Sequence, residues 1–233
     1  MKEAELILVD TKEGIHTLFN KTVEEHYHSL FGSLQESMHV FIRNGLIPVA
    51  RKYDEIRILE IGFGTGLNAA LTYRENHILQ KHIHYTTVEI NPLPIKVIQR
   101  LNYAEYFGSE LQPVFLEMHK CKWFEKINLT LNKERTSNGN EEFLFYKIHN
   151  DVLECSFDDS YDLVYFDAFS PAHQPELWQF ELFKKIYDAC NIGAALVSNC
   201  SKVDVKRTLS NVGFKVESLE GPKGKREMIR AVK

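Results

Sequence analysis

The sequence predicts an α/β fold whose sheet has seven strands and is mostly parallel. Three observations support this prediction: short apolar runs recur from residue 56 onward, helical patterns lie between them, and a short loop joins the last two runs. Strands that alternate with helices form right-handed βαβ units, which give a parallel sheet. The last two strands, joined directly, add an antiparallel edge.

The elements follow one another at regular intervals. The predicted strands are residues 56–61, 84–90, 143–148, 161–167, 194–199, 214–219 and 226–233. The predicted helices are residues 67–79, 91–101, 175–190 and 201–212. Ligands bind such sheets at the carboxyl ends of the parallel strands. We therefore expect the functional site in the loops that follow the first five strands.

Two regions depart from this alternation. Residues 26–46 carry apolar side chains spaced by three or four, which predicts an amphipathic helix. Residues 119–142 contain the polar stretch LNKERTSNGNEE and predict a surface insertion. We expect an N-terminal extension, residues 1–50, that packs on a core domain of residues 51–233.

The charge balance gives no sign of a nucleic-acid partner for the chain as a whole. The sequence has 28 Lys and Arg against 32 Asp and Glu, a net charge of −4. No run approaches the ~18 apolar residues that span a bilayer. The first residues show no basic segment followed by an apolar stretch. We therefore expect a cytoplasmic protein that has no membrane partner.

The cysteines and histidines do not predict a metal site. None of the four cysteines forms a C-x-x-C pair, so we expect reduced thiols. The two H-x-H pairs, at His26 and His28 and at His82 and His84, each lack a third ligand nearby. The prediction is that the protein binds no metal.

A glycine loop follows the first predicted strand. Three glycines at alternate positions let the backbone turn tightly beside a ligand, and the helix that follows offers free N–H groups. A dinucleotide-binding loop would need G-x-G-x-x-G, but its third glycine would fall on Leu67. The pattern is instead E-x-G-x-G-x-G, in the stretch Glu60-Ile61-Gly62-Phe63-Gly64-Thr65-Gly66-Leu67-Asn68.

Carboxylates stand at four successive strand ends: Glu60, Glu89, Asp151 and Asp167. A carboxylate at the position of Glu89 can accept hydrogen bonds from both hydroxyl groups of a ribose. Enzymes that bind NAD share that feature, so Glu89 indicates a ribose without naming the cofactor. The four acids together predict a ligand site more strongly than any one of them.

The segment LEIGFGTGLNAALT (59–72) resembles the methyltransferase domain of the MnmC-type enzymes, which modify the wobble uridine of certain tRNAs. So do YFDAFSPAHQPELW (165–178), GKREMIRAVK (224–233) and, less tightly, SLQESMHVFI (33–42). The resemblance implies a Rossmann-like class I fold that uses S-adenosyl-L-methionine (SAM). It implies that SAM contacts Glu60, Gly62, Phe63, Gly64, Gly66, Asn68, Glu89 and Asp151, with Asp167 facing the methyl group.

The reaction that the resemblance implies is the last step to 5-methylaminomethyl-2-thiouridine. SAM methylates the primary amine of 5-aminomethyl-2-thiouridine at the wobble position of tRNA. Two-domain members of the family also carry an FAD-dependent oxidase that unmasks this amine. A chain of 233 residues has no room for that domain. We therefore expect a stand-alone methyltransferase, with any oxidase step either supplied by another protein or bypassed.

Methyl transfer requires a neutral amine, and an alkyl amine has a pKa of roughly 10.4 in water. Asp167 is the candidate that orients the amine and takes its proton. A carboxylate with an ordinary pKa of about 4 is a poor base, so we expect orientation to be its main role. Phe169 and Pro171 are expected beside the amine, with Phe169 stacked on the flipped uracil.

The C-terminal residues give the RNA partner a positive surface. Residues 201–233 hold nine Lys and Arg against four Asp and Glu, a local charge of +5 on an acidic chain. We expect this surface to contact the anticodon stem-loop of tRNA. The candidates are Lys202, Lys206, Arg207, Lys223 and Arg230 for RNA, with Lys225 and Arg226 beside the substrate.

Two other functions fit the same residues. The first is an amine or polyamine transferase, since spermidine synthases also place a carboxylate after the fourth strand. The segments at 165–178 and 224–233 favour tRNA over this alternative. The second is a non-catalytic module that binds SAM or a nucleotide.

Overall fold

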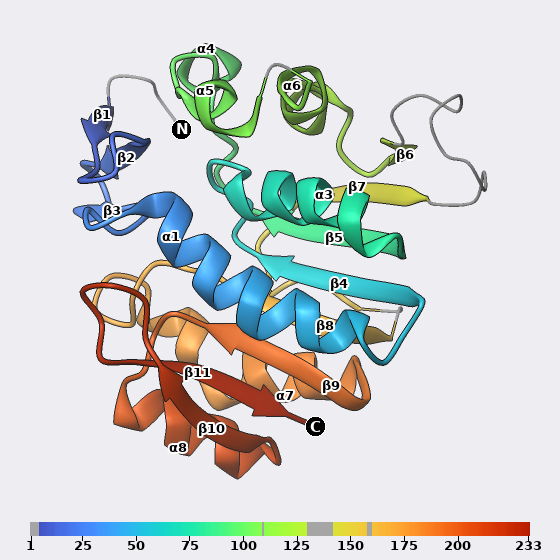
Figure 1. The fold of residues 1–233 in the computed structure, drawn as a ribbon. Coiled ribbons are helices and arrows are strands. Elements are labelled where there is room, and N and C mark those ends of the chain that lie inside the picture. Colours follow the sequence, from blue (N-terminus) through green and yellow to red (C-terminus); the bar gives the residue numbers. More distant parts are fainter. Residues whose placement is uncertain (1–4, 109, 130–141, 158–159) are drawn as a thin grey trace.

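The computed structural model describes residues 5–108, 110–129, 142–157 and 160–233. An eight-stranded sheet forms the centre of the molecule, with helices on both faces, and a small three-stranded sheet lies at the end where the parallel strands finish (Figure 1). The predicted α/β class, with a mostly parallel sheet, is confirmed.

The large sheet has the order β10-β11-β9-β8-β4-β5-β7-β6. Its parallel centre consists of β4 (Glu55–Ile61), β5 (His82–Glu89), β7 (Phe143–His149), β8 (Tyr161–Phe166) and β9 (Cys190–Ser198). Its antiparallel strands are β6 (Lys126–Asn128), β10 (Lys215–Glu220) and β11 (Glu227–Val232). Both edges are therefore antiparallel.

The predicted count of seven strands is one too low among the described residues. The additional strand, β6, lies within the expected insertion at 119–142 and places Ile127 beside Phe145. Three residues are too few to show an alternating pattern, so the sequence does not reveal this strand. The helix α6 (Gln112–Lys120) also overlaps the start of that range, and residues 130–141 lie outside the described part of the chain.

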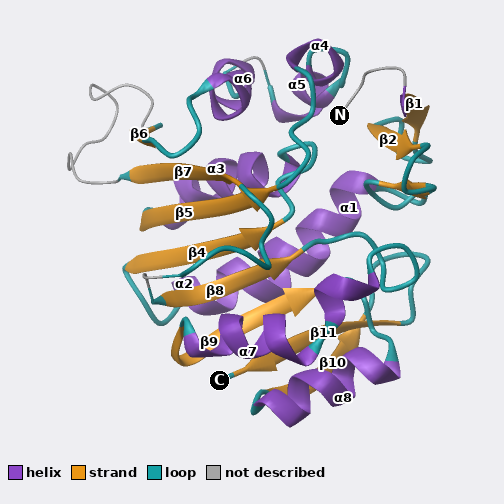
Figure 2. Cartoon of the chain, turned by 180° about the vertical axis from the view of Figure 1, so that it is seen from behind, coloured by secondary structure: helices purple, strands orange, loops and turns teal. Residues whose placement is uncertain are grey.

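Each face of the sheet is covered by its own helices (Figure 2). One face carries a continuous helical segment, α1 (Ser33–Ser37), η2 (Met38–Leu46, a π-helix) and α2 (Ile47–Ala50), together with α3 (Leu67–Leu79). The other carries η3 (Pro175–Trp178), α7 (Phe180–Asp188) and α8 (Val203–Val212). The buried apolar residues accordingly form two clusters. Phe41 and Tyr165 belong to the first cluster, and Phe166 and Phe183 to the second.

The helix predicted over 91–101 is shorter in the structure. It consists of α4 (Ile95–Ile98), followed by a separate α5 (Tyr103–Phe107). Pro94 is the N-cap of α4, and a proline disfavours helical geometry in the residue before it. The helix therefore begins after Pro94 and not at residue 91, where the sequence predicted its start.

The N-terminal residues, for which the sequence suggests only a helix, also form β1 (Leu6–Asp10), β2 (His16–Asn20) and β3 (Glu25–His26). This small sheet stands beside the carboxyl ends of the parallel strands (Figure 1). The expected helix over 26–46 begins only at Ser33, because residues 25–26 belong to β3 and residues 27–32 form bends and a turn. Val40, Phe41 and Leu46 are buried in the same core as Ile58 of β4. The division into an extension and a core at residue 50 stays a prediction.

Candidate active site

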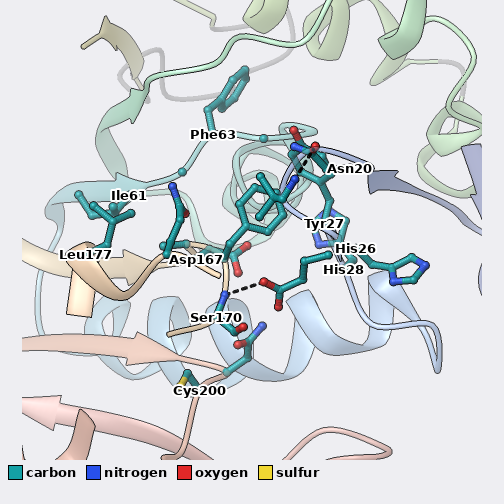
Figure 3. Close-up of a pocket in the computed structure, with 18 of the residues that line it drawn as sticks. Asn20, His26, Tyr27, His28, Ile61, Phe63, Asp167, Ser170, Leu177 and Cys200 are labelled. Atoms are coloured by element: carbon teal, nitrogen blue, oxygen red, sulfur yellow. Dashed lines mark hydrogen bonds between the residues drawn. The ribbon is translucent and has the colours of Figure 1, made fainter. Parts of the chain in front are cut away.

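A cavity of about 630 Å³ lies at the carboxyl ends of the parallel strands. Figure 3 shows its two sides: Ile61, Asp167 and Leu177 on one, Tyr27 and His28 on the other. We call the side built by the loops after β4, β5, β7 and β8 the sheet wall. The opposite side, built by residues 20–36 and by Lys225 of the loop 221–226, is the outer wall. A cavity of this size lies within the usual range for small-ligand sites.

The glycine loop forms the centre of the sheet wall. Gly62, Gly64 and Gly66 all have positive φ angles, of 91°, 50° and 74°. A Cβ atom at Gly62 would lie 2.7 Å from the carbonyl oxygen of Asp167, so a side chain there would displace the neighbouring strand end. The glycines therefore let β4 and β8 approach closely where a ligand must fit. Phe63 also lines the cavity, but its ring packs against those of His119 and Phe145.

Glu89, at the end of β5, is fixed across the glycine loop. Its Oε2 accepts a hydrogen bond from the N–H of Gly64 at 2.9 Å, and its Oε1 accepts one from the N–H of Asn91 at 2.7 Å. Each carboxylate oxygen keeps a lone pair for a ligand. Asp151 follows β7 and lines the same cavity, with its Oδ1 accepting the N–H of Leu153 at 2.9 Å.

Asp167 lies directly after β8 and faces the cavity. The side-chain amide of Asn68, on the first turn of α3, donates to its Oδ2 at 2.8 Å. The surrounding protein desolvates the carboxylate and raises its pKa to about 7, an effect that the hydrogen bond from Asn68 opposes. Glu36 raises this pKa further and Lys225 lowers it. The ordinary pKa assumed from the sequence is therefore wrong for this position.

Glu60 does not line the cavity. Its side chain is fully buried behind the glycine loop, near Thr87, Tyr85 and Asn68. Burial raises its pKa to about 8, so that the acid is largely protonated at neutral pH. The structure thus places Glu60 beneath Asn68 and Asp167, outside the reach of a ligand in the cavity. Gly66, the N-cap of α3, also lies outside the lining.

Thr65 connects the glycine loop to three other elements. Its Oγ1 lies 2.7 Å from Nε2 of His28, and it accepts a hydrogen bond from the hydroxyl of Tyr103 at 3.0 Å. Its carbonyl oxygen lies 3.1 Å from Nε2 of His119. Burial lowers the pKa of His28 to about 4 and that of His119 to about 3, so both imidazoles are neutral near pH 7. This buried network fixes the shape of the loop.

The outer wall brings in residues that the sequence did not mark as site residues. Glu25 accepts a hydrogen bond from the N–H of Ser170 at 2.9 Å, which joins β3 to the loop after β8 (Figure 3). The ring of Tyr27 meets that of Phe169 edge-on, with centroids 5.1 Å apart. The carbonyl oxygen of Phe169 accepts the indole N–H of Trp178 at 2.9 Å. Phe169 is thus held between the two walls.

Glu36 is a second buried carboxylate of the site. Its Oε1 lies 2.6 Å from Nζ of Lys225, and its Oε2 accepts the N–H of Ser29 at 3.0 Å. This ion pair joins α1 to the loop between β10 and β11, at opposite ends of the chain. In the sequence, only the resemblance of residues 33–42 to the MnmC-type family drew attention to the region of Glu36.

The predicted cations fall into three groups, and Lys225 of the first group is already paired with Glu36. Lys202 and Lys225 line the cavity, whereas Lys223 and Arg226 lie on the neighbouring loop between β10 and β11. Three others are held by acids: Lys206 by Glu227, Arg207 by Asp204 and Arg230 by Glu217. Pro171 does not line the cavity.

Metal-ligating clusters and membrane-spanning helices are both missing from the described part of the chain. Among the described residues, no three His, Cys, Asp or Glu side chains are grouped so that they could hold a metal ion. Nor does any helix in the described ranges have the length and apolar character needed to cross a membrane.

The fold and the site define an enzyme of the Rossmann-like α/β class. The chain belongs to the S-adenosyl-L-methionine-dependent methyltransferase family, whose model matches residues 114–233. SAM is therefore its cofactor. The membership agrees with the cofactor inferred from the motifs.

Two curated relatives are similar over most of the chain. The tRNA 5-methylaminomethyl-2-thiouridine biosynthesis bifunctional protein MnmC of Campylobacter hominis is 28% identical over 92% of this chain and 31% of its own length. The protein of the same name from Aromatoleum aromaticum is 31% identical, over 88% and 32%. The chain thus spans about a third of the length of these relatives.

Solved structures agree with the family. MNMC2 from Aquifex aeolicus matches with a TM-score of 0.75 and 26% identity, over 97% of this chain and 69% of that one. Spermidine synthase from Thermotoga maritima matches with a TM-score of 0.52 and 12% identity, over 100% and 74%, which shows a shared fold alone. The resemblance to MnmC-type proteins that the motifs indicated is confirmed.

Proposed function

We propose that this protein is an N-methyltransferase that converts 5-aminomethyl-2-thiouridine into 5-methylaminomethyl-2-thiouridine at the wobble position of tRNA. The observation that carries the proposal is Asp167, a partly desolvated carboxylate held by Asn68 where the glycine loop meets the cavity. The names of the similar proteins, MnmC and MNMC2, support the tRNA substrate.

The sheet wall fits SAM. Because the glycines have no side chains, the cofactor can approach the protein backbone closely. Glu89 keeps lone pairs for the ribose hydroxyl groups. Asp151 would accept a hydrogen bond from the adenine amino group. Gly62, Phe63 and Gly64 would contact the cofactor through their backbone. Bound SAM supplies an electrophilic methyl group on a positively charged sulfur.

The charge of the cavity suits this chemistry. Its described lining residues include six carboxylates and only two lysines, Lys202 and Lys225. A negative cavity stabilises both a sulfonium cofactor and the ammonium form of an amine substrate. Six of the acids of this chain thus lie where the sulfonium cofactor and the amine substrate would meet.

Asp167 orients the amine and accepts its proton before methyl transfer. An acceptor with a pKa near 7 is a better match to an amine than an ordinary aspartate, because the proton transfer is less uphill. Asn68 holds the carboxylate so that one oxygen, Oδ1, stays free to face the substrate. The rings of Tyr27 and Phe169, which line the cavity and meet edge-on, would shield the neutral amine from water.

The uracil ring would lie against Phe169, whose ring contacts Tyr27 and whose backbone carbonyl is held by Trp178. RNA would reach the cavity over Lys202, Lys223 and Arg226, which form the positive part of its surroundings. The proposal requires an enzyme that supplies the aminomethyl group, and places the reaction in the cytoplasm with tRNA.

Incubation with labelled SAM and either tRNA or polyamines tests this proposal. The tRNA comes from cells that accumulate the aminomethyl nucleoside. We expect the label in tRNA and none in spermidine or putrescine. Label in polyamine alone would overturn the tRNA substrate and favour the polyamine alternative.

A further inference from the structure

Phe31 is a fixed aromatic ring that remains exposed on the outer wall. Its side chain is 42% exposed. One contact is with Lys12, whose Nζ lies 4.1 Å from the ring centroid. Another is with Gly224, where an added Cβ atom would come within 2.5 Å of the ring, so that only glycine allows this packing. The mechanism proposed above does not use this ring.

The ring lies between the cavity and a second hollow. Leu30, the preceding residue, lines the cavity. Gly224 and Lys225 line a neighbouring groove of about 520 Å³, and Lys225 lines the cavity as well. Phe31 thus adjoins the groove through its contact with Gly224, and Lys225 connects the groove with the cavity.

The groove is held rigidly. The loop 221–226 is joined to α1 by the ion pair of Lys225 with Glu36. It is joined to η2 by the hydrogen bond between Nε2 of His39 and the carbonyl oxygen of Glu220, at 2.8 Å. A ligand that binds here meets a preformed surface and pays little ordering cost.

The charges of the groove favour an anion. Lys223 and Arg226 are exposed, and neither forms an ion pair with another described residue. Glu220 is the single acid among the described lining residues of the groove. By contrast, Lys206, Arg207 and Arg230 on the nearby helix and hairpin are neutralised by acids. Within this groove, Lys223 and Arg226 are therefore the cations available to a phosphate.

We propose that Phe31 and this groove bind the nucleotide next to the modified uridine, with its base stacked on Phe31 and its phosphate on Lys223 and Arg226. The proposal rests on the tRNA substrate proposed above and names the surface that recognises it. Splayed single-stranded RNA is bound by exposed aromatic rings and nearby cations. The ammonium group of Lys12 lies over this ring. It would move aside when the base stacks and would add a positive charge beside it.

The test compares an anticodon stem-loop RNA with the free nucleoside 5-aminomethyl-2-thiouridine. Phe31→Ala should raise KM for the RNA about tenfold with little change in kcat, because stacking is lost. Methylation of the free nucleoside should be unchanged, since the nucleoside does not reach Phe31. Phe31→Tyr keeps the ring and should behave as the wild type, and unchanged SAM affinity verifies that each variant is folded.

Salt dependence separates stacking from charge. The double variant Lys223→Ala, Arg226→Ala should flatten the slope of RNA affinity against salt by about 1.4, while Phe31→Ala should leave the slope unchanged. Arg207→Ala, which removes a cation already paired with Asp204, is the matched control and should leave it unchanged too.

Two outcomes are decisive and distinct. If the wild type methylates the RNA and Phe31→Ala has wild-type KM, or loses RNA and nucleoside activity equally, this inference is overturned. If the wild type methylates neither the RNA nor the nucleoside, the proposed function itself fails.

Discussion

The two walls of the cavity differ in how they are built. The sheet wall consists of residues that end or follow parallel strands, such as Glu89 at the end of β5 and Asp167 after β8. The outer wall joins the two ends of the chain, where Glu36 of α1 meets Lys225 of the C-terminal hairpin. The sheet wall is characteristic of the fold and would hold the cofactor. The outer wall comes from the N-terminal residues and the C-terminal hairpin, and would decide which amine enters.

This difference teaches that cofactor and substrate recognition can be separated by mutation. Changes in the sheet wall should alter SAM binding or the chemical step. Changes in the outer wall should alter the substrate and the pH dependence, and leave SAM affinity nearly unchanged. Substitutions in each wall test whether the two walls act separately.

The largest effect is expected for Asp167→Ala in the sheet wall. Loss of the group that orients the amine and accepts its proton should lower kcat by roughly 10²- to 10⁴-fold. Steady-state methylation with calorimetric SAM titration measures both properties, and SAM should still bind. Asp204→Ala, an exposed carboxylate on α8, is the control and should keep full activity. Normal methylation by Asp167→Ala would remove Asp167 from the mechanism.

Glu89→Gln should weaken SAM binding by roughly 10- to 100-fold, because hydrogen bonds to a charged carboxylate contribute about 1.5–3 kcal/mol. At saturating SAM, kcat should be close to that of the wild type. Glu36→Gln, in the outer wall, should change SAM affinity less than threefold. Calorimetry on both variants checks this comparison, and equal losses would show that the walls do not act separately.

Glu60→Gln tests the buried acid beneath the sheet wall through stability. The pKa of Glu60 rises from 4.5 to about 8 on folding. The contribution of this group to the free energy of unfolding is therefore fully present below pH 4.5 and is lost as the pH rises through 8. The variant lacks this loss. Its unfolding free energy relative to the wild type should be higher at pH 8 than at pH 5 by about 3–4 kcal/mol. Denaturant unfolding at both pH values measures it, and a constant difference would contradict the assigned pKa.

The smallest effects are expected for the ion pair in the outer wall, and they have opposite signs. Glu36 raises the pKa of Asp167 and Lys225 lowers it. Glu36→Gln should therefore move the acidic limb of the pH–rate profile to lower pH, and Lys225→Met should move it to higher pH. Each change corresponds to about threefold in rate on that limb. The free nucleoside is the substrate of choice, because Lys225 also borders the RNA groove. Shifts in the same direction would exclude this coupling.

The sequence predicted the sheet wall well, for a physical reason. A carboxylate that follows a parallel strand must emerge at the same edge as its neighbours, so Glu89, Asp151 and Asp167 could be placed together before the structure was known. Their environment could not be predicted. The raised pKa of Asp167 depends on desolvation by residues from distant parts of the chain.

The outer wall was beyond sequence reasoning, because its contacts join residues separated by most of the chain. The same limit applies to the surface charges. Nine cations could be counted near the C-terminus, but not which of them were already paired. Arg230, for example, lies opposite Glu217 in the register of β10 and β11 and is held by it. The short β6 likewise left no pattern to detect.

The most direct test of the account is nucleoside mass spectrometry after the protein acts on tRNA that carries 5-aminomethyl-2-thiouridine, with SAM present. The account predicts that this nucleoside is replaced by 5-methylaminomethyl-2-thiouridine at the wobble position, and that Asp167→Ala leaves it unchanged. Persistence of the aminomethyl nucleoside with the wild-type protein, or methylation at another position of the tRNA, would contradict the account.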